Sequence, residues 1–171
     1  MNFGKISTFT SGVLALANQR VNDLEIDFIQ AAPKNNIENI IVLNINSDVP
    51  DYDYLLKTFF NMGFRVIISD TISELFAAKA LNHGIIAIEV SNQFLDKIIR
   101  LSKKLPAKLF VDLKGQEIMI VNSGEKEFFK MSEYRRQCYE EGKDDVEYLY
   151  DVWDNIEHST KMDESIDYAI E

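Results

Sequence analysis

The stretch GFRVIISDTISELFAAKALNHGIIAI, residues 63–88, decides the fold of this chain. It holds two compact apolar runs, 64–69 and 85–90, whose lengths suit buried strands. Between these runs, Thr71 and Glu74 have the spacing of a capping box, which marks the start of a helix. The pattern therefore predicts a strand, a helix and a second strand.

The helix between the two runs is expected to close at Gly84, because glycine readily adopts the left-handed conformation that ends helices. Its expected buried stripe consists of Ile72, Leu75, Phe76 and Leu81. Upstream, residues 40–45 (IIVLNI) predict another buried strand, and a weak alternation over residues 6–16 predicts a strand near the N-terminus.

A further helix is expected between residue 45 and Gly63. Ser47 or Asp48 is its expected N-cap, with Pro50 in its first turn, and Gly63 ends it. Its apolar face consists of Leu55, Leu56, Phe59, Phe60 and Met62.

Downstream, Ser91 is expected to cap a third helix, whose apolar residues are Phe94, Leu95, Ile98 and Ile99. Residues 108–113 and 117–122 then alternate around Lys114-Gly115, which predicts a β-hairpin. Helices that alternate with apolar strands are typical of a parallel sheet. The sequence therefore predicts an α/β domain with a largely parallel sheet core, flanking helices and an attached β-hairpin.

Towards the C-terminus, Ser132 is expected to cap a helix that ends near Gly142. The last residues are polar. We therefore predict one domain over residues 1–160 and an acidic tail over residues 161–171.

The composition fits a globular chain, because 46% of its 171 residues are hydrophobic and 11% are aromatic. No apolar run reaches the roughly 18 residues of a membrane span, and the N-terminus does not resemble a signal peptide. The single cysteine, Cys138, excludes an internal disulfide and a four-cysteine metal site. These features favour the cytoplasm.

The net charge of −10 is concentrated late in the chain, where residues 132–171 hold thirteen acidic and four basic side chains. Such a surface repels phosphate backbones, so nucleic-acid binding is not expected. The acidic residues form either a solvated face or a docking face for a basic partner.

Familiar catalytic motifs are absent, including the phosphate-binding loops, the zinc-binding H-E-x-x-H and the nucleophile elbow G-x-S-x-G. The histidines, His83 and His158, each lie near an expected helix end, where the helix dipole favours an imidazolium. Cys138 lies inside an expected helix and is interpreted as a small packed residue.

Asp51 and Asp53 lie in the expected first turn of a helix, where free N–H groups stabilise carboxylates. The same position faces the crevice at the carboxyl ends of parallel strands, where ligands bind in α/β sheets. General acid–base chemistry by this pair is therefore the functional alternative to a structural role.

Arg135 and Arg136 are adjacent, and two sets of contacts are open to them. They pair with Asp144 and Asp145, or they contact a partner. The two aspartates themselves are most simply the start of another helix.

Three ordered blocks resemble one family, the small subunit of 3-isopropylmalate dehydratase, which is the swivel domain of the aconitase superfamily. In the first block, 63–88, the matching residues are Gly63, Phe64, Arg65, Phe76, Gly84 and Ile88. The second is V-D-L at 111–113 with the following 116–118. In the third, 129–146, the matching residues are Arg135, Arg136, Cys138, Gly142, Asp144 and Asp145.

The resemblance implies a β/β/α swivel domain that works with a separate large subunit. In the family, that large subunit holds an iron–sulfur cluster, whose open iron acts as a Lewis acid on a substrate hydroxyl. The pair interconverts 2- and 3-isopropylmalate in leucine biosynthesis. No cofactor is then expected in this chain, and one cysteine is consistent with that division.

The family's substrate loop, G-[SC]-G-S-S-R-E-H, falls on residues 47–54, SDVPDYDY. Both glycines are missing, Pro50 and Asp51 replace the serines, and Tyr52 replaces the arginine. An acidic loop without arginine should repel a dicarboxylate. No catalytic residue is therefore assigned, and the weak candidates for the substrate loop are Ser47, Asp48, Asp51 and Asp53.

Three functional hypotheses follow. The chain is an active small subunit of such a hydro-lyase, or it is a catalytically inactive homologue that serves as a binding or regulatory module. The third hypothesis, self-assembly through apolar helix faces, is compatible with either.

Overall fold

The computed structural model describes residues 8–16, 40–43, 51–104 and 107–143. The strands are β1 (Thr8–Leu16), β2 (Ile40–Leu43), β3 (Val66–Ser69), β4 (Ile86–Glu89), β5 (Lys108–Asp112), β6 (Glu117–Ile120) and β7 (Glu125–Phe128). The helices are α2 (Tyr52–Asn61), α3 (Glu74–Asn82), α4 (Asn92–Ser102) and α5 (Glu133–Glu141). The described strands form one sheet in the order β4-β3-β2-β1-β5-β6-β7.

The sheet has a parallel half and an antiparallel half, joined by β1. Strands β1 to β4 pair in parallel, whereas β5, β6 and β7 pair antiparallel. Residues 8–12 of β1 pair with β5, and residues 13–16 pair with β2. The predicted α/β class, with its parallel core and hairpin, is confirmed. Strand β7 extends the hairpin, and the sequence pattern does not predict it because three of its four residues, EKEF, are charged.

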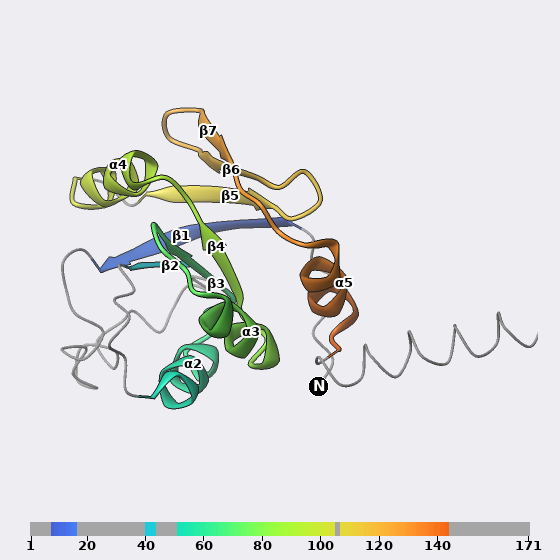
Figure 1. Cartoon of the computed structure of the whole chain (residues 1–171). Coiled ribbons are helices and arrows are strands. Elements are labelled where there is room, and N and C mark those ends of the chain that lie inside the picture. Colours follow the sequence, from blue (N-terminus) through green and yellow to red (C-terminus); the bar gives the residue numbers. More distant parts are fainter. Residues whose placement is uncertain (1–7, 17–39, 44–50, 105–106, 144–171) are drawn as a thin grey trace, which may run out of the picture.

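Alternate residues of the parallel strands face opposite helices. On one face, Ile41 and Ile67 pack with the apolar residues of α2 and α3. On the other, Val42 and Ile68 pack with α4, with β5 and β6, and with Cys138 of α5. Figure 1 shows α4 on one side of these strands and α2 and α3 on the other. Burial on both faces explains why these strands are continuous apolar runs.

The start of α2 differs from the sequence expectation. Its N-cap is Asp51, whose Oδ1 accepts a hydrogen bond of 3.0 Å from the N–H of Tyr54. The prediction of Ser47 or Asp48 as the cap, with Pro50 in the first turn, is therefore wrong. Asp51 is the first residue after the proline that combines an extended backbone with a carboxylate able to reach the first turn.

Helix α3 also begins later than predicted. Ser73, rather than Thr71, is its N-cap, and its Oγ accepts a hydrogen bond of 3.1 Å from the N–H of Phe76. The buried face of α3 consists of Phe76, Ala77, Ala80 and Leu81, so Leu75 is 61% exposed instead of buried, and Ile72 lies before the helix rather than in its stripe. Phe76 and Leu81 are buried as expected.

The remaining helix boundaries agree with the sequence. Ser91 caps α4 and Ser132 caps α5, each by accepting a hydrogen bond from the first turn. Gly63 and Gly142 follow α2 and α5 with φ of 96° and 69°, values that favour glycine. None of the helices in the described ranges is long and apolar enough to cross a membrane.

Several predictions fall outside the described residues. They concern the helix expected at Asp144 and Asp145, the position of His158, and the boundary between 1–160 and 161–171. These stay predictions.

Candidate functional site

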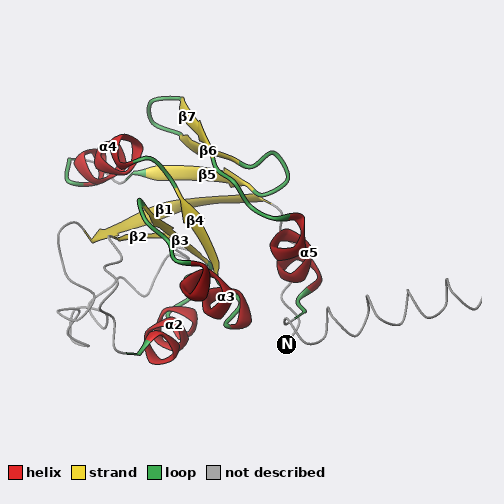
Figure 2. Ribbon diagram, in the orientation of Figure 1, coloured by secondary structure: helices red, strands yellow, loops and turns green. Residues whose placement is uncertain are grey.

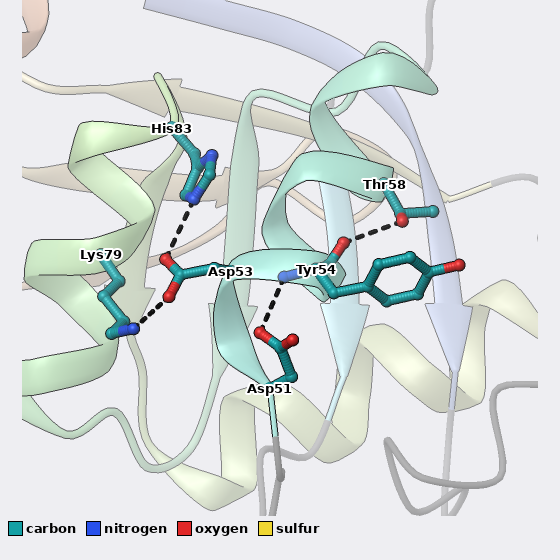
Figure 3. A network of polar contacts seen from close by, with 6 residues as sticks. All are labelled: Asp51, Asp53, Tyr54, Thr58, Lys79 and His83. Atoms are coloured by element: carbon teal, nitrogen blue, oxygen red, sulfur yellow. Dashed lines mark hydrogen bonds and ion pairs between the residues drawn. The ribbon is translucent and has the colours of Figure 1, made fainter.

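Asp53 connects the first turn of α2 to the end of α3 (Figure 3). Its Oδ1 lies 3.2 Å from Nε2 of His83, the C-cap residue of α3, and its Oδ2 forms an ion pair with Nζ of Lys79. Beside this contact, the ring of Tyr52 packs edge-on against Phe76, with ring centroids 5.2 Å apart. The start of α2 is therefore held against α3 by both polar and apolar contacts.

This arrangement gives the Asp53 carboxylate a structural role. Hydrogen bonds from Lys79 and then from His83 hold the pKa of Asp53 below its ordinary value of 3.8. A carboxylate with a lowered pKa is a weak base, which does not suit proton abstraction at neutral pH. Asp51 is likewise engaged as the helix cap. Ser47 and Asp48 lie outside the described residues, and the assignment of all four as substrate-loop residues stays a prediction.

The Asp53 contact predicts a specific pH dependence. A carboxyl whose pKa is lowered in the folded state contributes stability that is present above its unfolded pKa and is lost as the pH falls through the folded pKa. Between about pH 5 and pH 2, the wild type should therefore lose more unfolding free energy than Asp53→Asn. Urea unfolding at a series of pH values measures the difference, which Lys79→Met should reduce. Parallel pH curves for the wild type and Asp53→Asn would contradict it.

A separate pocket of about 510 Å³ lies at the carboxyl ends of β3 and β4. The loops that leave these strands lead directly into α3 and α4 (Figure 2). Its lining residues are Asp70, Ile72, Glu74, Ala87, Glu89, Val90, Ser91, Asn92, Glu127, Phe128, Phe129, Lys130 and Arg135. This is the edge of an α/β sheet at which ligands generally bind. Asp51 and Asp53 do not line this pocket.

In this pocket, carboxylates of the chain itself accept hydrogen bonds from backbone N–H groups. Glu127 accepts hydrogen bonds from the N–H and Oγ of Ser91, at 2.5 and 2.7 Å, at the start of α4. Glu89 accepts one of 2.9 Å from the N–H of Ile72, just before α3. Free N–H groups at helix starts are natural anion sites. Here the starts of α3 and α4 each receive a carboxylate of the chain itself.

Three further charged groups of the pocket, Asp70, Glu74 and Arg135, also have partners within the chain. Asp70 accepts a hydrogen bond of 3.1 Å from Nδ2 of Asn92, and Arg135 forms an ion pair with Glu74. The lining contains four carboxylates, two more than its two cationic side chains. A dicarboxylate would enter it against this charge.

Sequence reasoning missed this pocket, although a signal for it exists. The rule that ligands bind at the carboxyl ends of parallel strands points equally to Ser69-Asp70 and Glu89-Val90, which end the two predicted strands. Glu127 carries no such signal, because the strand that presents it is not predicted.

Arg135 and Arg136 contact carboxylates of α3 and α5 within the part of the chain that the structure describes. Arg135 pairs with Glu74 of α3, whereas Arg136 contacts Glu133 and Glu140 within α5. The alternative partners Asp144 and Asp145 lie outside the described residues.

The residues of this chain do not fit an iron–sulfur cluster. Its only cysteine, Cys138, is buried on α5 in the apolar core, as expected for a packed residue. Across the described ranges there is no group of three or more His, Cys, Asp or Glu side chains that could hold a metal ion.

The residues that match the family blocks mostly build the fold. Gly63 and Gly142 follow helix ends, and Phe76 is fully buried. Arg65 donates hydrogen bonds to the carbonyl groups of Phe60 and Phe64, and its guanidinium lies 4.0 Å from the centre of the Phe60 ring. The residues that match the family therefore support a shared fold and give no evidence about the substrate loop.

Comparisons with known proteins find several similar sequences. The chain is 38% identical over 96 residues to the 3-isopropylmalate dehydratase small subunit of Cytophaga hutchinsonii, covering 56% of this chain and 48% of the relative. It is 34% identical over 88 residues to the corresponding subunit of Christiangramia forsetii, covering 51% and 43%. A more distant match, to the subunit of Geobacillus sp. WCH70, is 26% identical over 128 residues and covers 72% and 63%. No family model matches the chain.

The fold has a counterpart among solved structures. The crystal structure of 3-isopropylmalate dehydratase from Methanocaldococcus jannaschii superposes with a TM-score of 0.60 over 90% of this chain and 99% of that chain, at 14% sequence identity. The chain spans about half the length of the first two curated relatives. Over part of its length the chain is similar to small subunits of 3-isopropylmalate dehydratase, and it shares the α/β fold of the Methanocaldococcus jannaschii protein.

Proposed function

We propose that this chain acts as the small, swivel-type subunit of a hydro-lyase of the 3-isopropylmalate dehydratase type. The observation that carries the proposal is the 38% identity to a curated small subunit over 96 residues. The activity would be the interconversion of 2- and 3-isopropylmalate in leucine biosynthesis, in the cytoplasm. The chain would work with a large subunit that holds the iron–sulfur cluster.

The polar groups of this chain limit the role that it would play. At the start of each of α2, α3 and α4, one N–H group is engaged by a carboxyl or hydroxyl oxygen of the N-cap residue. The pocket beside α3 and α4 also holds more carboxylates than cations, so the substrate's carboxylates would be bound mainly by the large subunit. This chain would close the site and exclude water from it.

A second candidate is a catalytically inactive homologue that serves as a binding or regulatory module. The observation that favours it lies at the start of α2. Asp51, which stands in the place of a family serine, caps the helix, and Tyr52, which stands in the place of the family arginine, packs on Phe76. Neither side chain is presented as an anion ligand.

Coexpression of the full chain with the large subunit from the same genome separates the two candidates. Under anaerobic conditions, a copurified complex that interconverts 2- and 3-isopropylmalate would support the hydro-lyase. A stable complex without turnover would select the inactive module. Two folded proteins that form no complex and show no turnover would exclude the hydro-lyase role.

The ligand and the assembly state of the chain alone need separate measurements. Isothermal titration with 2-isopropylmalate that gives clear micromolar binding would count against the inactive module. Sedimentation of the isolated chain tests self-association, and a strict monomer would remove that hypothesis.

A further inference from the structure

Two large apolar side chains lie exposed beside the acidic pocket. Phe128, at the end of β7, is 72% exposed and forms part of the pocket wall. Leu75 lines an adjoining groove of about 520 Å³ between α3 and α5. Glu74 and Arg135 belong to both hollows. We call this continuous area, with Phe128, Leu75 and the Glu74–Arg135 pair between them, the rim surface.

The rim surface lies along the edge of the sheet at which the parallel strands β3 and β4 end. Because β2, β3 and β4 are parallel, their carboxyl ends lie along one edge. The pocket sits at the ends of β3 and β4. The stretch that replaces the family loop follows β2 along the chain, after Leu43. A partner that covers that edge would therefore also meet the rim surface.

The chemistry of the rim surface indicates what a partner would present. Single exposed apolar residues are common, but two such residues beside one polar pocket resemble the anchors of a protein interface. The pocket contains Asp70, Glu74, Glu89 and Glu127 against Lys130 and Arg135. Charge complementarity therefore calls for a basic surface on the partner.

Strand β7 ends the described sheet and offers a possible edge for strand addition, but it is four residues long and carries Glu125, Lys126 and Glu127. Short, charged edge strands resist pairing with another strand. Contact through side chains fits this edge better than an added strand.

We propose that the rim surface is the docking surface for the large subunit, which presents an apolar pocket to Phe128 and Leu75 and basic side chains to the acidic pocket. The inference rests on the proposed function, because it names the same partner. It goes further by specifying which face and which side chains make the contact.

The test compares four charge-introducing variants of the full chain for binding to the purified large subunit from the same genome. Phe128→Asp and Leu75→Asp change the rim surface. Val121→Asp and Arg100→Asp are the controls, because Val121 is 43% exposed, the Arg100 side chain is 78% exposed, and neither residue lines either hollow. Circular dichroism and thermal melting establish that each variant is folded.

Each rim variant is expected to weaken binding about 10-fold or more, as loss of an interface anchor does. The controls should bind as the wild type does, and the wild-type dissociation constant should rise with salt, because salt screens attraction between exposed charges. If both rim variants bind the large subunit with wild-type affinity, the rim surface is not the docking surface, while the proposed function stays intact. Equal losses in the controls would overturn the docking surface as well. Absence of wild-type binding would overturn both proposals together.

Discussion

Replacement of Phe76 by alanine is expected to lower the free energy of unfolding by about 3–5 kcal/mol, the usual cost of removing a buried aromatic ring. Phe76 is fully buried between the parallel sheet and α2, and its ring packs edge-on against Tyr52. Natural domains have only about 5–15 kcal/mol of stability. The loss would therefore remove a large share of the total and lower the melting temperature by on the order of 10 °C.

Leu75 provides the matched control for this experiment, because it is the preceding residue of the same helix but is exposed. Leu75→Ala should change the free energy of unfolding by only about 0.5 kcal/mol or less. Urea unfolding of both variants measures the contrast. Equal losses in the two variants would contradict the start of α3 at Glu74 and the orientation that it gives these side chains.

Replacement of Glu127 by alanine is expected to lower the free energy of unfolding by about 1–2 kcal/mol. The Glu127 carboxylate accepts two hydrogen bonds from Ser91, the N-cap residue of α4. A carboxylate at a helix start also interacts favourably with the helix dipole. The variant loses both effects and leaves the Ser91 groups to be solvated by water.

A double-mutant cycle isolates this contact. Glu127→Ala and Ser91→Ala should each destabilise the protein, and their effects should fall short of additivity by about 1 kcal/mol. Glu125→Ala is the matched control on the same strand. Its ion pair with Lys97 is exposed on both sides, so it should contribute about 0–1 kcal/mol. Additive effects of Glu127→Ala and Ser91→Ala would show that the contact does not stabilise the fold.

The sequence predicts the order of elements well because the signals involved are local. The apolar runs of β2, β3 and β4 and the serines that cap α4 and α5 all act within a few residues. The errors are local as well. Thr71 and Ser73 are both good caps, and only the packed helix selects Ser73 and turns Leu75 outward.

Less of the candidate site can be predicted from the sequence. Asp51 and Asp53 were predicted at the start of a helix, and they lie there. That Asp53 would contact Lys79 and His83 depends on how α2 packs on α3. The acidic pocket depends equally on packing, since its walls come from α3, α4, α5 and the β7 segment together.

The sequence by itself determined the α/β class, the succession of strands and helices, and the likeness to a family of small subunits, because periodicity, caps and glycines act over short distances. Only the tertiary structure decided which carboxylate meets which N–H group. Glu127 lies 36 residues from Ser91, and Glu89 lies 17 residues from Ile72. Such contacts depend on strand order and on helix packing. Strand order and helix packing bring distant segments together, and neither can be predicted from the pattern of one segment alone.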